Sequence, residues 1–194
     1  MANGRVLTGF SLPYVAEYTY TTASGVQYSD GAILARGVSV SLSVEAGDDN
    51  VFYADNTAAE SVSGKFQSGT CTLTVDGLKD AAAKLILGLP AADGSGWTSY
   101  GNNMAPPYVG IGFVCRYMSS GAEEFVPVIL PKCKFQIPGL EAATQEEDIS
   151  WQTQELTADI LRDDTSNGNW KMVGTATTTE ALAQGMITAA FGIV

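Results

Sequence analysis

The chain has 194 residues, 45% of them hydrophobic, and its 10 basic and 21 acidic residues give a formal net charge of −11. One domain of this length buries roughly 70% of its unfolded surface. The acidic charge excludes tight binding to a phosphate backbone, because that affinity comes from Lys and Arg displacing counterions. The chain contains no histidine, which excludes a serine or cysteine triad of the usual kind.

The first predicted elements are two strands, at residues 14–22 and 26–34, joined by a turn at Ser24-Gly25. Residues 38–45 then alternate with a period of two, which predicts a sheet with one buried face and one wettable face. The same alternation recurs in the next predicted strand, residues 65–76. The predicted polar face comprises Ser39, Ser41, Ser43 and Glu45 on the first of these strands, and Thr70, Thr72 and Thr74 on the second.

Between these strands, residues 46–56 are acidic and turn-prone but carry two aromatic residues, Phe52 and Tyr53. Aromatic residues in a long polar loop indicate a contact surface. The alternative is that both rings fold back onto their own domain.

A change of periodicity from two to 3.6 predicts one short amphipathic helix over residues 78–89. Residues 91–107 follow as a long surface loop with Trp97 and Tyr100. Residues 108–117 and 124–130 form the clearest predicted hairpin, and residues 132–137 continue the sheet.

The region from 141 to 164 begins with acidic residues and leads into a strand with polar residues on both faces around residues 152–155. This pattern is typical of a strand that bends, or that leaves its own core to join a neighbour. Residues 163–169 match the first half of a calcium-binding loop, but Gly174 replaces the bidentate glutamate, so we expect a hairpin turn. Thr177 and Glu180 have capping-box spacing before an Ala-rich stretch, which predicts a frayed helix or an arm.

The sequence predicts no catalytic residue, no cofactor and no metal site, and we expect that the protein is not an enzyme. No serine lies in a G-x-S-x-G elbow, and Gly64-Lys65 and Gly110-x-Gly112 are incomplete phosphate and dinucleotide motifs. The carboxylate pairs Glu123-Glu124 and Glu146-Glu147 are adjacent in sequence, so on a strand each pair points to opposite faces.

Three cysteines, Cys71, Cys115 and Cys133, lie in apolar strand-like settings without C-x-x-C spacing. We expect them to be reduced, buried and structural. No secretory leader is visible at the N-terminus and no window reaches about 18 apolar residues. We therefore expect the chain to fold in a reducing cytoplasm.

Four segments, residues 3–13, 35–45, 108–116 and 143–164, together resemble the major tail tube protein of long-tailed phages of Gram-positive bacteria. The resemblance spans most of the chain and is weakest after Thr175. It rests on extended pattern, since these are scaffold sequences without a catalytic signature.

The resemblance implies a mainly β fold, a β-sandwich or barrel of the tail tube type with one short flanking helix and extended loop and terminal arms. Residues 1–176 would form the tube domain with its N-terminal arm, and residues 177–194 a C-terminal arm or frayed helix. Six protomers would form a ring, and stacked rings the tube through which DNA leaves the virion.

The implied location is the virion tail, after assembly in the host cytoplasm, with no membrane involved. The implied partners are further copies of the chain, the tape measure, tail terminator and distal tail proteins, and DNA that passes without tight binding. The candidate lumen residues are the seven residues of the predicted polar face together with Glu155. The candidate inter-ring residues are Asp48, Asp49, Asn50, Phe52, Tyr53 and Asp55.

Two other classes stay open. One is a non-tube virion decoration protein or a carbohydrate-binding module on a similar β-sandwich, in which Trp97, Tyr100, Phe52 and Tyr53 would gather into one groove. The other is a hydrolase that uses acidic residues.

Overall fold

A computed structural model describes residues 4–48, 50–54, 57–62, 64–102, 104–144 and 151–193, with the backbone alone described for 50–54 and 57–62. The fold is mainly β, as the sequence predicts. An eight-stranded antiparallel sheet has the order β2-β1-β7-β8-β9-β6-β3, with β10 paired to β8, and β4 and β5 form a separate two-stranded sheet. The strands are β1 (Val6–Thr21), β2 (Gly25–Ile33), β3 (Gly37–Ala46), β4 (Asn50–Ala54), β5 (Thr57–Val62), β6 (Phe66–Val75), β7 (Val109–Ser119), β8 (Ala122–Phe135), β9 (Gln154–Leu161) and β10 (Met172–Val173), and the helices are α1 (Asp80–Leu87) and α2 (Glu180–Phe191).

The first hairpin, β1 and β2, is present as predicted, but β1 begins earlier than expected. Val6 is already paired with Met118 of β7, so the segment expected as an N-terminal arm belongs to the sheet from Val6 onwards. Pro13 fits inside the strand because the register with β7 shifts between Ser11 and Tyr14, and irregular positions of this kind tolerate proline.

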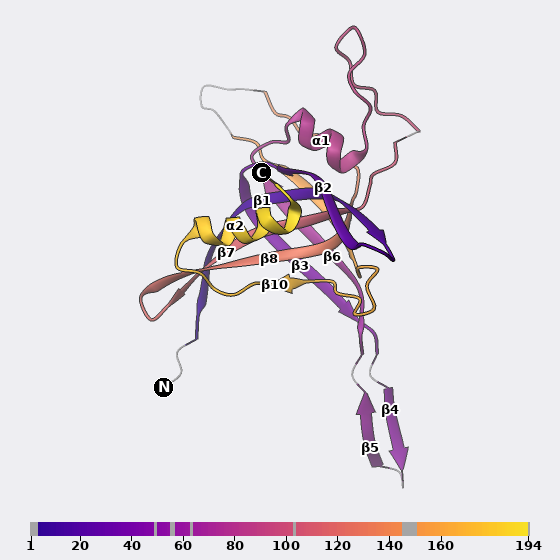
Figure 1. The fold of residues 1–194 in the computed structure, drawn as a ribbon, viewed down its shortest axis with the longest axis vertical. Helices are drawn as coiled ribbons and strands as arrows, with labels where there is room; N and C mark the ends of the chain where they lie inside the picture. The colour runs from indigo at the N-terminus through magenta and orange to yellow at the C-terminus, as the bar shows by residue number, and fades with distance from the viewer. Residues whose placement is uncertain are drawn as a thin grey trace.

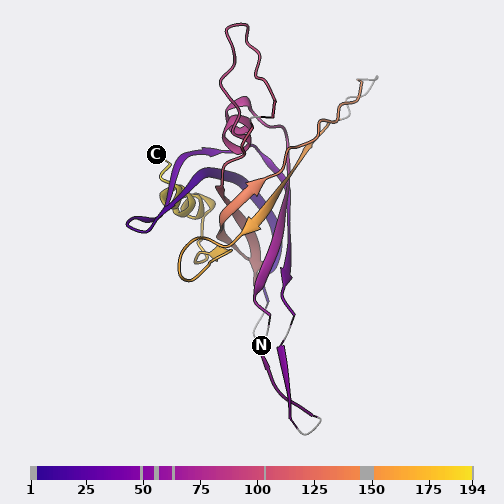
Figure 2. The same cartoon turned by 90° about the vertical axis from the view of Figure 1, so that its right-hand side faces the viewer.

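The large sheet folds over on itself and encloses the main hydrophobic core. Phe10 of β1 lies against Gly37 of β3, where an added Cβ would lie 2.3 Å from the phenyl ring. Fully buried core side chains come from both halves of the sheet and from α1, and include Val15, Leu73, Ile86, Ile111 and Leu156. In Figure 2, β3 and β6 lie on one side of the molecule and α2 on the other.

A second core lies between α2 and the outer side of β1, β7 and β8. Ala183, Ile187 and Phe191 of α2 are buried there. Gly110 and Gly112 of β7 leave room for the helix: a Cβ at Gly112 would lie 2.5 Å from Ile187 Cγ2, and one at Gly110 2.9 Å from Phe191 Cε1. The glycines that looked like a partial dinucleotide motif therefore have a packing role.

The described residues form two short helices, so the expectation of one flanking helix is wrong. The C-terminal segment forms a regular helix whose N-cap is Thr179, with its side chain accepting from Leu182 N at 3.4 Å. The predicted capping box at Thr177 and Glu180 is also wrong, because Thr177 forms an isolated bridge with Phe125.

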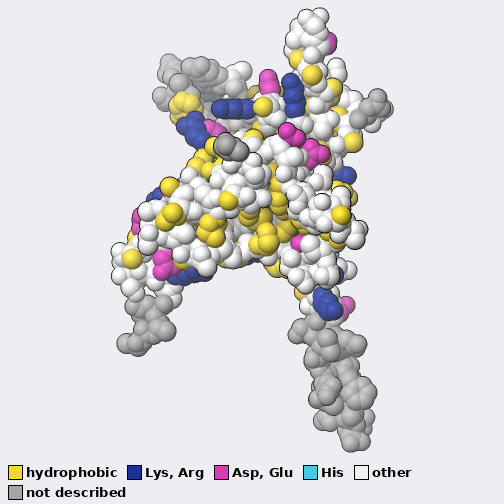
Figure 3. Space-filling view, viewed as in Figure 1, with side chains coloured by type: hydrophobic (Ala, Val, Ile, Leu, Met, Phe, Trp, Pro, Cys, Tyr) yellow, Lys and Arg dark blue, Asp and Glu magenta, His cyan; other side chains and the backbone are white. Residues whose placement is uncertain are grey.

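Hydrophobic side chains gather on the surface of the molecule over α2 and β10 (Figure 3). The exposed hydrophobic side chains of these two elements include Met172, Val173, Leu182 and Met186.

Three predictions are confirmed: the helix over residues 78–89, the loop over residues 91–107, and the hairpin that follows this loop. Helix α1 ends at Gly88, which adopts the left-handed conformation that favours glycine. Among the described residues of 91–107 no helix or strand is formed. The β7–β8 hairpin turns at Ser120 and Gly121, both with positive φ, as a tight two-residue hairpin requires.

Residues 46–56 were expected to form a loop, and this expectation is wrong. Strands β4 and β5 form a ribbon that projects from the end of β3 and β6, at the bottom of Figure 1. At its base, Gly47 N donates to Lys65 O at 2.9 Å, and a Cβ at Gly64 would lie 1.5 Å from Gly47 O. The two backbones meet too closely there for a side chain on Gly64.

At the opposite end, the chain between β8 and β9 leaves the sheet as an arm. Its described parts are residues 136–144 and 151–153, which extend away from the body in Figure 2, at the upper right. Glu146, Glu147 and Asp148 lie outside the described residues. The described parts of the arm and the ribbon lie at opposite ends of the molecule in Figure 2.

Candidate functional surface

The predicted polar residues of β3 and β6 lie opposite one another in the sheet. Ser39 faces Thr74, Ser41 faces Thr72, and Ser43 faces Thr70. Directly opposite residues of an antiparallel pair carry their side chains on the same face. Ser39 Oγ donates to Thr74 Oγ1 at 2.9 Å, so the hydroxyls of the two strands are in direct contact.

Strand β9 extends this face by one more row. Glu155 faces Thr74, Thr157 faces Thr72, and Asp159 faces Thr70. Thr157 and Asp159 are therefore additional members of the surface that sequence analysis did not select. Their shared parity with Glu155 was visible in the sequence, but parity alone does not say which strand lies next to β9.

Strand β8 completes the surface at its far edge. Lys134 faces Asp159, and Gln136 Nε2 donates to Asp159 Oδ1 at 3.0 Å. We call the resulting surface the polar face; it comprises Ser39, Ser41, Ser43, Glu45, Ser68, Thr70, Thr72, Thr74, Lys134, Gln136, Glu155, Thr157 and Asp159.

The polar face carries hydroxyls and few charges. Three carboxylates, on Glu45, Glu155 and Asp159, are accompanied by the ammonium of Lys134. Lys132 lies on the same side of β8, but its ammonium is paired with Asp164. Ser68 Oγ donates to Glu45 Oε2 at 2.9 Å. The alternate residues of β6 and β9 point into the core and are buried. This surface is well hydrated and weakly acidic, which favours low adhesion to a polyanion.

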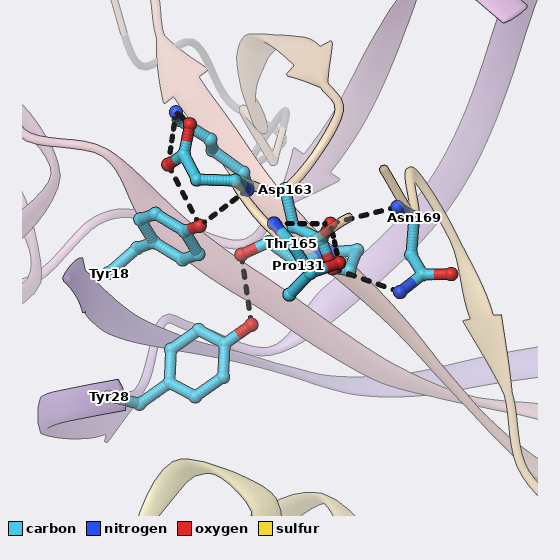
Figure 4. Close-up of polar contacts among 8 residues, drawn as sticks. Tyr18, Tyr28, Pro131, Asp163, Thr165 and Asn169 are labelled. Atoms are coloured by element: carbon cyan, nitrogen blue, oxygen red, sulfur yellow. Dashed lines mark hydrogen bonds and ion pairs between the residues drawn. The ribbon is translucent and has the colours of Figure 1, made fainter. Parts of the chain in front are cut away.

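A polar network holds the loop after β9 against the sheet (Figure 4). Asp163 is only 7% exposed, and its carboxylate accepts from Thr165 Oγ1 at 2.6 Å, Asn169 N at 2.9 Å and Asn169 Nδ2 at 3.0 Å. These donors occupy both carboxylate oxygens. A turn is therefore present and Asp163 closes it, but it is not the expected hairpin turn, because β10 pairs with β8 and not with β9.

Next to this turn, Lys132 connects three elements. Its Nζ lies 2.7 Å from Asp164 Oδ2 and within 5.3 Å of the ring centroids of Tyr18 and Tyr108. The hydrogen bond from Lys132 lowers the pKa of Asp164. Burial raises the pKa of Tyr18 to about 12, and its hydroxyl donates to Asp164 Oδ2 at 3.0 Å. Tyr28 Oη donates to Pro131 O at 3.0 Å nearby.

The three cysteines are free and buried, as expected. Burial raises the pKa of Cys71 to about 12 and raises those of Cys115 and Cys133 as well. A buried thiol that stays protonated is a poor nucleophile, so these side chains serve packing.

The carboxylate pair Glu123-Glu124 does not converge. Glu124 pairs with Arg5 at 3.8 Å and Glu123 with Arg116 at 3.8 Å. In the parts of the chain that the structure describes, no cluster of His, Cys, Asp and Glu is arranged to hold a metal ion. Within the same residues, no helix is long and apolar enough to cross a membrane.

The aromatic residues considered for a ligand groove are spread along the molecule. Trp97 and Tyr100 lie in the loop after α1, whereas Phe52 and Tyr53 lie on β4 in the ribbon, at the other end of Figure 1. The four residues therefore do not form one groove.

Comparison with models of known protein families finds no match to this chain, and comparison with curated proteins finds none.

Proposed function

We propose that this protein is a structural subunit of a tail tube, in which rings of identical copies stack around a channel that passes DNA. The observation that carries the proposal is the polar face, a continuous surface of hydroxyls and carboxylates over β3, β6, β9 and the end of β8. The sequence resemblance to phage tail tube proteins supplies the context, and the proposed location is the virion tail.

The polar face suits a channel lining for a physical reason. DNA carries dense negative charge, so a wall of small hydroxyls and scattered carboxylates repels the phosphates weakly and offers few attachment points. A wall rich in Lys and Arg would retain the DNA instead. Glu45, Glu155 and Asp159 outnumber Lys134 on this surface, and the neighbouring Lys132 is neutralised by Asp164.

The arrangement of the elements also supports assembly into a ring. Strand β3 is the last strand in the order of the large sheet, and terminal strands offer backbone groups to a neighbouring chain. Val38 and Val44 on β3 are exposed, and contact with a neighbouring subunit would cover them. The ribbon would contribute contacts between rings, as the resemblance implies.

The alternative of a decoration or carbohydrate-binding protein has less support, because its four candidate aromatic residues lie at two ends of the molecule. It stays open for a site built on the loop of Trp97 and Tyr100 alone. A glycan-binding screen separates this class from a tube subunit.

The test of the proposal is electron microscopy of the purified protein over a range of concentration and salt, with light scattering for mass. We expect rings or hollow tubes, favoured at higher salt because screening weakens repulsion between acidic subunits. A reconstruction of the tube should place the polar face on the channel wall. Tubes with this face outside, or only monomers under every condition, would contradict the proposal.

A further inference from the structure

Two strands of the large sheet, β2 and β10, each have a single partner strand among the described residues. Strand β2 pairs with β1, and β10 pairs with β8. After β10 the chain stays alongside β8: Gly174 N donates to Pro127 O at 2.8 Å, and Thr177 forms a bridge with Phe125. Each of the two strands therefore has one edge that no other strand of the described chain covers, and such an edge can pair with another chain.

The two uncovered edges lie at the same level of the sheet. Ile33 of β2 pairs with Tyr14, Tyr14 with Gly112, Gly112 with Ile129, and Ile129 with Met172 of β10. Directly opposite residues carry their side chains on the same face. Tyr14 and Ile129 are buried in the core beneath α2, whereas Ile33 is 51% exposed and Met172 41%. This row of paired residues thus begins and ends in an exposed apolar side chain.

Neither edge has the residues that usually protect an edge strand. Proteins place Lys or Pro within exposed edge strands to prevent pairing. Strand β2 contains neither residue type, and residues 172–179 contain neither. The second segment is instead rich in threonine and includes the exposed Val173, and both residue types favour strands. Both edges are therefore suited to pair with a further strand.

Each edge has one charged residue, and the two charges are opposite. Asp30 is the only charged residue of β2, and Lys171 is the only one among residues 170–179. Both side chains are exposed, and neither belongs to an ion pair within the part of the chain that the structure describes. Lys171 precedes Met172, so it lies at the level of Ala32, two residues from Asp30. Pairing of two β2 edges, or of two β10 edges, would place equal charges along one short contact, whereas pairing of β2 with β10 brings opposite charges together.

We propose that the β2 edge of one copy pairs with the β10 edge of the next copy, so that Ile33 covers Met172 and Asp30 faces Lys171. The two edges differ, so the contact is head-to-tail and repeats from copy to copy. In Figure 1, β2 lies above β10 along the long axis of the molecule, so the contact joins copies along this axis. The inference rests on the proposed function and assigns a contact between successive rings.

The test is disulfide cross-linking between the two edges, with Ile33→Cys in one preparation and Met172→Cys in another. The native cysteines are buried, so they react little with an oxidant. Within one copy the two positions are separated by four strand spacings, roughly 19 Å. A disulfide allows about 7 Å at most between the two Cα atoms. A disulfide between these positions therefore reports a contact between two copies.

The two preparations are mixed over the range of concentration and salt used to assemble the wild type, oxidised with copper phenanthroline and separated on a non-reducing gel. We expect a dimer band from the mixture and none from either variant alone, because a head-to-tail contact does not place a position next to its own counterpart. The double variant should give a ladder of multimers. Leu7→Cys mixed with Met172→Cys is the matched control: Leu7 is 56% exposed but lies away from both edges, so it should give no dimer. Circular dichroism checks the fold of each variant.

A charge reversal tests the proposed ion pair separately. Lys171→Glu should need about tenfold more protein to assemble at about 0.15 M salt, because two carboxylates would then meet in the contact. Lys79→Glu, just before α1, changes the net charge by the same amount and should assemble like the wild type. Sedimentation and light scattering measure the assembly, and equal behaviour of the two variants would contradict the pairing of Asp30 with Lys171.

The outcomes separate the inference from the function. Tubes from the wild type without a cross-link in the mixture, or with equal cross-linking of the Leu7 control, would overturn the inference and leave the tube proposal standing. Cross-linked chains of copies that enclose no channel would support the inference and contradict the tube. A wild type that stays monomeric at every concentration and salt, with no cross-link in the mixture, would contradict both.

Discussion

Lys132 shows how one side chain fixes parts of the chain that are distant in sequence. It lies on β8, pairs with Asp164 after β9, and lies close to the rings of Tyr18 and Tyr108. The ammonium is the cause of the lowered pKa of Asp164. A carboxylate whose folded pKa is lowered stabilises the fold above its unfolded pKa, and this contribution disappears as the pH falls through the folded value.

We therefore predict that Lys132→Met lowers stability at neutral pH and reduces the part of the acid sensitivity that Asp164 provides. The contribution from Asp164 is at most about 1 kcal/mol, since its side chain is 43% exposed and such pairs are screened by solvent. It should be lost below about pH 4, the ordinary range of an aspartate. Urea unfolding from pH 7 to pH 2 measures it.

The control for this prediction is Lys79→Met, a cation with no ion pair among the described residues. The hydrogen bond from Arg36 also lowers the pKa of Asp76, and Asp76 contributes equally to the acid sensitivity of the two variants. If the free energy of unfolding of Lys132→Met fell as steeply as that of the control when the pH is lowered from 7 to 2, the role given to Asp164 would be wrong.

At the scale of elements, α2 depends on the strand beneath it. Gly110 and Gly112 of β7 have no side chain, and Ile187 and Phe191 occupy the space above them. The 3.6 periodicity of α2 is weak in sequence because its outward face also contains apolar residues, Leu182 and Met186. Gly185 also weakens the Ala-rich stretch, and for this reason the sequence left a frayed helix and an arm open as alternatives.

We predict that Phe191→Ala lowers the free energy of unfolding by about 3–5 kcal/mol, because a fully buried phenyl ring is lost. Leu182→Ala on the same helix is the matched control. Its side chain is 57% exposed, so its effect should stay within about 0.5 kcal/mol. Equal effects in chemical denaturation would show that α2 does not pack on the sheet in solution.

At the scale of the whole molecule, the polar face lies between two projecting ends. Strands β3 and β6 connect directly to the ribbon at one end, and β8 and β9 connect to the arm at the other. The ribbon pairs with itself and belongs to a separate sheet, so the main core does not depend on it.

We predict that replacing residues 48–63 by a two-residue turn leaves a folded subunit that does not form tubes. The close approach of Gly47 and Gly64 brings the two ends together, so a short turn closes the gap. Thermal melting should show a cooperative transition close to that of the wild type, while electron microscopy should show no tubes. A wild-type yield of tubes would rule out a stacking role for the ribbon.

The sequence by itself determined most strands of the large sheet, the helix α1 and the two faces of β3 and β6, but it did not predict β4, β5 or β10. These features depend on local periodicity, and a period of two assigns each side chain to a face without knowledge of the neighbouring strand. The burial of the cysteines and the presence of a turn at residues 163–169 followed from local composition in the same way, although this turn does not join paired strands as a hairpin turn would.

The tertiary structure alone decided which strands lie together. The polar face depends on β3, β6, β9 and β8 being neighbours, and such pairings between distant segments are set by the packing of the whole core. Thr157, Asp159, Lys134 and Gln136 could not be assigned to this face before the pairing was known. The role of Gly110 and Gly112 was hidden for the same reason, because the helix that fills their space comes from the far end of the chain.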